Sequence, residues 1–238
     1  MFILPVHRTA TWLLLAAVGL VAVSAVAIYA RDELGITRVA GVTYLQILRI
    51  DREVNNLPSW YSSSLLLIGG LSIAAIGARV PVRGLRMRWC ALAALLVVMS
   101  IDESVRLHER LDSLVSNIVG LRMPWFVPAG ILVMALLTAT RDVWRTVSRG
   151  DRRRFAQGAA VFAAGSVGVE VIYKLVAPEA VSLLHYALVH VEEGVEMCGV
   201  ALLLRAAWLT MAPDGRLAFA IGHDEPVPST VRSDSTRR

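Results

Sequence analysis

Ionisable side chains interrupt three strongly apolar stretches of the sequence, and these residues could do chemistry. Charged groups are costly and rare in a lipid bilayer, so each needs a partner, a proton or a metal ion. Metal binding or proton transfer at a buried site is therefore the chemistry that they could support. The candidate residues in these stretches are Asp102, Glu103, Ser104, His108, Glu109, Glu170, His185, His190, Glu192, Glu193 and Glu196.

Helical spacing sorts the last of these stretches into two faces. His185, Glu192 and Glu196 are separated by seven and then four residues, which places them on one face of a helix. His190 and Glu193 lie on an adjacent face. Carboxylates and imidazoles on facing helices form the metal sites of helix bundles, and this set suits zinc, iron or manganese. We expect the three stretches to meet in one polar pocket.

The leading hypothesis is a metal-dependent membrane enzyme that acts on a lipid or a lipid-soluble small molecule. Its divalent metal ion would be held by ligands drawn from Asp102, His108, His190, Glu193 and Glu196. Glu103 or Glu192 would then serve as the general base for metal-bound water. Further candidates for the pocket are Glu53, Ser104, Glu109, Glu170 and His185.

Two other functions remain open at this stage. A proton- or cation-coupled transporter would use Glu196 and Glu170 as titrating groups, although the sequence shows no internal repeat of the kind that many transporters have. A non-catalytic membrane subunit or sensor would use the same polar network only to hold its helices together. Glu170 and Lys174 are four residues apart, so a simple ion pair also explains both.

The composition places the chain in a membrane. Of the 238 residues, 56% are hydrophobic and 18% are charged, against about 45–50% and about 25% in soluble domains. These values exclude a disordered protein and an ordinary cytosolic enzyme, and two cysteines are too few for a disulfide framework. The net charge of +5 is interpreted as a topology signal. We expect the lipid bilayer as partner and no nucleic acid, and the sequence leaves the oligomeric state open.

The apolar runs predict an all-α, polytopic membrane protein. Continuous runs of this length favour helices, because backbone groups in lipid must pair within their own segment. The six transmembrane helices are expected at about 11–30, 60–78, 89–107, 124–141, 155–176 and 183–209. They form one domain over residues 1–211, and residues 212–238 are expected to be a disordered cytoplasmic tail.

Arginines in the connections predict the orientation. The 79–88 connection carries four arginines and no acid, and the 141–154 connection carries six arginines against two acids. Basic connections stay in the cytoplasm, whereas the charge-balanced connections at 31–59 and 108–123 and the 177–182 connection, which holds one acid and no base, are expected outside. Six helices then place both termini in the cytoplasm and make the polar pocket face outward. We expect the protein in a bacterial inner membrane.

Three blocks carry a resemblance to known sequences: residues 53–63, which include Glu53, Pro58 and Trp60, then residues 100–109, then residues 192–199. Together they resemble a group of uncharacterised bacterial multi-pass membrane proteins. That resemblance implies no catalytic role, but it adds Glu53 to the candidate residues.

A fainter similarity connects the chain to ceramidase-like membrane metal hydrolases. Ser104 and His108 reproduce the Ser-x-x-x-His motif of that family. His185 and His190 are five residues apart, where that family has two histidines four apart, and the six expected helices compare with seven there. The similarity implies a zinc-dependent hydrolase.

Overall fold

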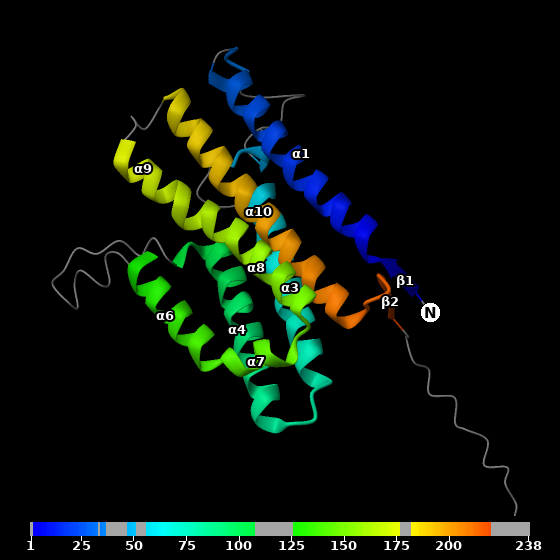
Figure 1. The fold of residues 1–238 in the computed structure, drawn as a ribbon. Coiled ribbons are helices and arrows are strands. Elements are labelled where there is room, and N and C mark those ends of the chain that lie inside the picture. Colours follow the sequence, from blue (N-terminus) through cyan, green and yellow to red (C-terminus); the bar gives the residue numbers. More distant parts are fainter. Residues whose placement is uncertain are drawn as a thin grey trace, which may run out of the picture.

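The computed structural model of the chain describes residues 2–32, 34–36, 47–50, 56–107, 126–176 and 182–219. In these residues the fold is a bundle of long helices that run alternately in opposite directions (Figure 1). One short two-stranded sheet lies at the end of the bundle where the described chain begins and ends. The predicted all-α class is therefore confirmed, apart from these two strands.

Each of the six predicted segments is helical. The elements are β1 (Phe2–Pro5), α1 (Val6–Asp32), α3 (Leu57–Ala78), α4 (Arg83–Val105), α6 (Phe126–Ala139), α7 (Arg141–Thr146), α8 (Arg149–Ala163), the π-helix η1 (Ala164–Val169), α9 (Glu170–Val176), α10 (Leu183–Met211) and β2 (Arg216–Phe219). Three helices begin at capping residues that sequence periodicity had not marked. The side chains of Asn56, Ser148 and Ser182 each accept a hydrogen bond from a backbone N–H of the first turn.

Four helices in the described part of the chain are long and apolar enough to cross a membrane: α1, α3, α4 and the continuous helix Arg149–Val176. This indicates a membrane protein. The expectation of six spans goes further than this evidence. α6 has 14 residues, fewer than the roughly 20 needed to cross a bilayer. α10 has 29 residues but carries three glutamates and Arg205, and it is not among the four.

The two ends of the described chain pair with each other. β1 and β2 form an antiparallel ladder in which Ile3 lies opposite Ala218. The expectation that disorder begins at residue 212 therefore fails for residues 216–219, and the bundle brings α1 and the end of α10 close enough for pairing. Both ends of the described chain consequently lie at the same end of the bundle (Figure 1).

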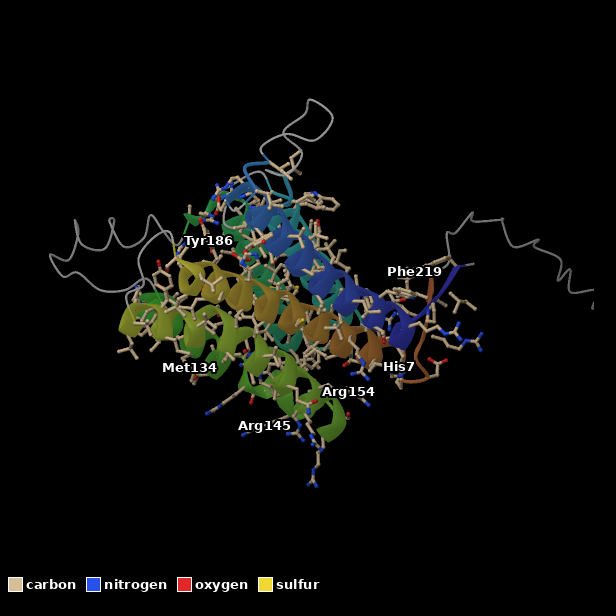
Figure 2. The ribbon with its side chains drawn as sticks, turned by 90° about the horizontal axis from the view of Figure 1, so that it is seen from above. His7, Met134, Arg145, Arg154, Tyr186 and Phe219 are labelled. Atoms are coloured by element: carbon tan, nitrogen blue, oxygen red, sulfur yellow. The ribbon has the colours of Figure 1, made fainter. Side chains whose placement is uncertain are left out.

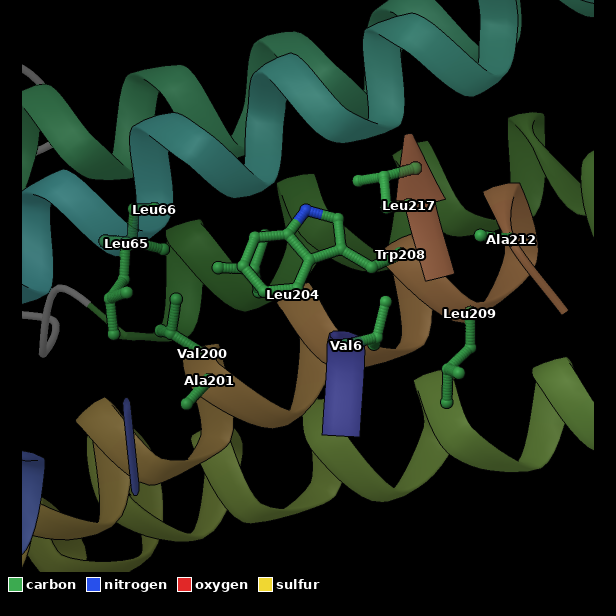
Figure 3. Close-up of a cluster of buried hydrophobic side chains, with 10 residues drawn as sticks. All are labelled: Val6, Leu65, Leu66, Val200, Ala201, Leu204, Trp208, Leu209, Ala212 and Leu217. Atoms are coloured by element: carbon green, nitrogen blue, oxygen red, sulfur yellow. The ribbon is translucent and has the colours of Figure 1, made fainter. Parts of the chain in front are cut away.

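A buried hydrophobic cluster fixes this end of the bundle (Figure 3). Trp208 of α10 lies among Val6, Leu65 and Leu217, which come from α1, α3 and β2. Its indole N–H donates a hydrogen bond to Ser72 Oγ at 3.2 Å. The cluster thus ties three elements to α10, and the indole nitrogen has a hydrogen-bond partner.

Glycines allow the helices to approach closely along two seams. In the first, α4 packs on α3, where an added Cβ at Gly77 would lie 2.7 Å from the Cβ of Trp89. In the second, α8 packs on α10, where an added Cβ at Gly199 would lie 2.4 Å from the backbone nitrogen of Phe162. Small residues permit such backbone contact between helices in membranes. α10 also contacts α1 and α3, so it lies at the centre of the bundle.

Candidate functional site

Carboxylates of α4 and α10 meet beside α3. Glu103, two residues before the end of α4, hydrogen bonds with Ser62 of α3 and interacts electrostatically with Glu193 of α10. Glu196 interacts in turn with Glu193, Glu103 and Asp102. We call this group, together with Glu192, the acidic cluster. The structure therefore brings together five acidic residues that the sequence had selected from two separate stretches.

The cluster forms although α4 packs mainly on α3 and not on α8 or α10. Two features of the sequence make this arrangement possible. Gly70 lets the backbone of α4 come close, since an added Cβ there would lie 3.0 Å from the Ala93 carbonyl oxygen. Ser62 then offers a small polar side chain that is only 1% exposed, at the level of Glu103. The acidic end of α4 thus reaches α10 across α3.

The π-helix η1 lies against the cluster. An added Cβ at Gly165 would lie 2.8 Å from Glu196 Cγ and 3.0 Å from the Glu192 carbonyl oxygen, so η1 and α10 touch at this point. π-helical turns are rare and occur often at functional sites. The widened turn therefore lies at Glu196, about 20 Å along α10 from its first residue, Leu183, at 1.5 Å per residue.

Serine hydroxyls continue the polar region between α3 and α4. Ser63 Oγ lies 3.0 Å from Ser100 Oγ and 2.9 Å from Ser104 Oγ. The Ser100 hydroxyl donates to the Ser63 carbonyl oxygen at 2.8 Å. Ser104, predicted as a pocket residue, thus belongs to a hydroxyl chain. α4 ends at Val105, two residues before the expected end at 107, because Arg106 adopts a left-handed conformation with φ 51°.

His190, a predicted metal ligand, forms hydrogen bonds through both of its ring nitrogens. Its Nδ1 lies 2.6 Å from the Tyr186 carbonyl oxygen, which can only accept, so Nδ1 carries a proton. Its Nε2 lies 3.0 Å from Ser24 Oγ of α1, and that oxygen accepts the backbone N–H of Ile50 at 2.8 Å. Both ring nitrogens are therefore used in a buried link between α10, α1 and residue 50.

Two more predicted residues have partners outside the acidic cluster. His185 Nδ1 lies 3.0 Å from the Tyr173 hydroxyl of α9. Glu170 pairs with Lys174, with 3.1 Å between Oε1 and Nζ, and the ammonium lies 5.2 Å from the centre of the Phe126 ring. Glu170 is thus held in an ion pair within α9.

Only some of the proposed metal ligands lie close together in the structure. Across the described ranges, no group of three His, Cys, Asp or Glu side chains is arranged to hold a metal ion. Three of the candidates, Glu53, His108 and Glu109, lie outside the described residues. Among the described residues, the acidic cluster supplies carboxylates, whereas the His190 ring nitrogens are hydrogen bonded to Tyr186 and Ser24.

The opposite end of the bundle is basic. Arg88 of α4 forms an ion pair with Asp142 of α7, and this guanidinium lowers the pKa of the Asp142 carboxyl below its ordinary value. Along α10, Tyr186 lies at the opposite end from His7 and Phe219, as Figure 2 shows from above. The arginine-rich connections and the acidic cluster are therefore separated along the helix axes.

A protein family described as a domain of unknown function (DUF8692) matches residues 12–211. The chain belongs to this family. No curated protein and no solved structure matches the chain. The DUF8692 match includes the acidic cluster, η1 and the Ser24–His190 link, whereas β1 and β2 lie outside it.

Sequence reasoning missed several polar contacts of this DUF8692 domain. Ser24, Ser62 and Ser63 lie inside apolar segments, and a hydroxyl within a membrane-length helix was the available signal. The absence of a side chain at Gly165 favoured close helix packing, but the sequence did not show that α10 would approach it at Glu196.

Proposed function

We propose that this is a multi-pass protein of the bacterial inner membrane that couples transport to proton or cation binding at the acidic cluster. The observation that supports this function is the convergence of Glu103 on α4 with Glu193 and Glu196 on α10 inside the bundle. Ionised carboxylates repel each other strongly where the dielectric constant is low, and the Arg106 guanidinium that acts on Glu103 carries only one positive charge, so such a group favours the binding of protons or a further cation.

The neighbouring groups fit proton movement. The hydroxyls of Ser63, Ser100 and Ser104 form a chain of donors and acceptors between α3 and α4, and Ser62 joins Glu103 to α3. The π-helix η1 contacts Glu196 through Gly165. Widened turns of this kind are frequent at functional sites. Groups of buried carboxylates such as the acidic cluster are typical of proton relays in pumps and transporters.

Six passes with both termini in the cytoplasm form the second part of the proposal. The arginine-rich connections at 79–88 and 141–154 lie at the same end of the bundle as the paired strands, and their charge favours the cytoplasm. Single cysteines in place of Arg86 and Arg149 should be labelled only after the membrane is made permeable. Labelling from outside intact cells would reverse the orientation and place the acidic cluster nearer the cytoplasm.

A metal-dependent enzyme has less support, because both His190 nitrogens are hydrogen bonded within the bundle. The enzyme hypothesis can be tested directly by measuring the metal content of the purified protein. About one tightly bound divalent ion per chain, lost in Glu196→Ala, would favour the enzyme over the transporter.

The transport proposal is tested by proton movement into vesicles. Full-length protein in liposomes that contain a pH-sensitive dye should collapse an imposed pH gradient faster than empty liposomes, and Glu196→Gln and Glu103→Gln should slow this collapse strongly. Glu170→Gln is the matched control, because the structure holds this residue, expected from the sequence as a titrating group, in an ion pair with Lys174 within α9. Wild type no faster than empty liposomes would exclude net proton movement by the protein alone, and equal loss in the control would exclude a specific role of the acidic cluster.

Infrared spectroscopy tests the cluster without transport. At neutral pH the wild type should show the carbonyl band of a protonated carboxyl group, shifted in heavy water and weaker in Glu196→Gln. A spectrum without this band in the wild type would show that the acidic cluster holds no proton.

A further inference from the structure

A cavity of about 280 Å³ lies between α8 and α10, away from the acidic cluster. Its walls are formed by Arg154, Gln157, Val161, Leu202, Arg205 and Ala206. On α8 these positions follow a helical spacing of three and then four residues, so they form one stripe that faces the cavity.

The polarity of the cavity changes along the helix axes. α8 and α10 run antiparallel, since Gly158 contacts Leu203 and Gly165 contacts Glu196. Arg154 and Arg205 therefore lie at the arginine-rich end, whereas Val161 and Leu202 lie toward the middle of the bundle. The distance along α8 from Arg154 to Val161 is about 10 Å at 1.5 Å per residue. A cationic end followed by an apolar end matches a molecule with an anionic head and a hydrocarbon chain.

Both guanidinium groups can bind an anion in their present positions. Arg154 Nη1 bonds to Asp151 at 2.5 Å, and Arg205 Nη2 lies 3.4 Å from His7 Nδ1. Each guanidinium has five N–H donors in a planar fork, which suits phosphate oxygens, so one such contact leaves further donors. Gln157 adds an amide N–H to the same wall.

We propose that this cavity binds an anionic phospholipid, with its phosphate at Arg154 and Arg205 and the start of an acyl chain along Val161 and Leu202. Basic pockets between membrane helices on the cytoplasmic side are suited to anionic head groups. The site is independent of the proton chemistry proposed for the acidic cluster, which lies further along the same helix pair. The lipid would hold α8 against α10 beyond the glycine contacts.

The test uses full-length protein in neutral detergent and follows thermal unfolding while lipid is added. Phosphatidylglycerol should raise the unfolding midpoint of the wild type at lower concentrations than phosphatidylcholine with the same acyl chains. Arg205→Gln and Arg154→Gln should each weaken the apparent affinity for phosphatidylglycerol by about five-fold. This factor corresponds to the loss of about 1 kcal/mol of binding free energy, which is typical of one arginine near an anionic surface. Inorganic phosphate should have little effect by itself.

Arg153→Gln is the matched control, because it removes the same charge from the exposed side of α8 outside the cavity. Arg205→Lys tests folding, since it keeps the charge and should lose less affinity than Arg205→Gln. Equal responses to the two lipids, or equal weakening by Arg153→Gln, would overturn the proposed site. A phosphate response as large as the lipid response would show an anion site that has no role for the acyl chain, and would also overturn it.

Discussion

Replacing Gly165 with alanine should force η1 away from α10 beside the acidic cluster. The new Cβ would lie 2.8 Å from Glu196 Cγ, 2.9 Å from the Glu196 backbone nitrogen and 3.0 Å from the Glu192 carbonyl oxygen. Carbon atoms in good contact are about 3.5–4.0 Å apart. Two of the three neighbours are backbone atoms, which cannot rotate away, so the seam itself must open by roughly 0.5–1 Å.

The cost follows from two opposing effects. Overpacking of a filled interior typically costs about 1–3 kcal/mol. Alanine is favoured over glycine within a helix by about 0.5–1 kcal/mol. The free energy of unfolding of Gly165→Ala should therefore fall by roughly 0.5–2 kcal/mol.

Gly168→Ala is the matched control in the same π-helix. No atom outside its local chain lies within 4 Å of an added Cβ there, so this variant should be as stable as the wild type or slightly more stable. Unfolding in detergent micelles at one pH, followed by tryptophan fluorescence, compares the three proteins. If Gly165→Ala matched Gly168→Ala, the close contact between η1 and α10 would be disproved.

Three further predictions concern other contacts. Ser24→Ala should lower the free energy of unfolding by about 1–3 kcal/mol, because it leaves a buried imidazole nitrogen and a backbone N–H without their partner; unchanged stability would contradict this network. The ion pair with Arg88 lowers the pKa of Asp142 in the folded protein below its ordinary value of 3.8. The pair therefore stabilises the folded state at pH values above 3.8, and this stabilisation is lost as the pH falls through the lowered pKa. Asp142→Asn should flatten that part of the stability–pH curve, and an unchanged curve would exclude the pair as its cause. Cysteines at Ile3 and Ala218, in a background without the native cysteines, should form an intramolecular disulfide on oxidation, detected by mass spectrometry; free thiols would disprove the strand pairing.

Much of the helical framework is readable from the sequence. The apolar runs predicted the positions of α1, α3, α4, α6, α8–α9 and α10, because the length and composition of a run are local properties that do not depend on packing. Errors in the helix bounds occurred mainly at the starts. Arg83 and Arg149 lie within the first turns of α4 and α8, where hydropathy is low although the backbone is already helical.

The candidate residues were also visible as acids and histidines within apolar runs, but their partners were not. Glu103 and Glu196 were expected in one pocket, and in the structure they interact electrostatically. His190 was selected by the same rule, yet the structure directs it to Ser24 of α1, 166 positions away in the sequence. A residue's type shows that it needs a partner, and only the packing of helices decides which partner it meets.

The tertiary structure also decided the features that depend on close approach. β1 and β2 are separated by more than 200 residues, and they pair because α1 and α10 bring both ends of the described chain to one end of the bundle. Gly165 became a determinant of the acidic cluster only when α10 came within contact distance of η1. Hydropathy and charge are properties of single residues, so the sequence shows them directly. The contacts described here depend on the directions and separations of whole helices, so they form only when the bundle is assembled.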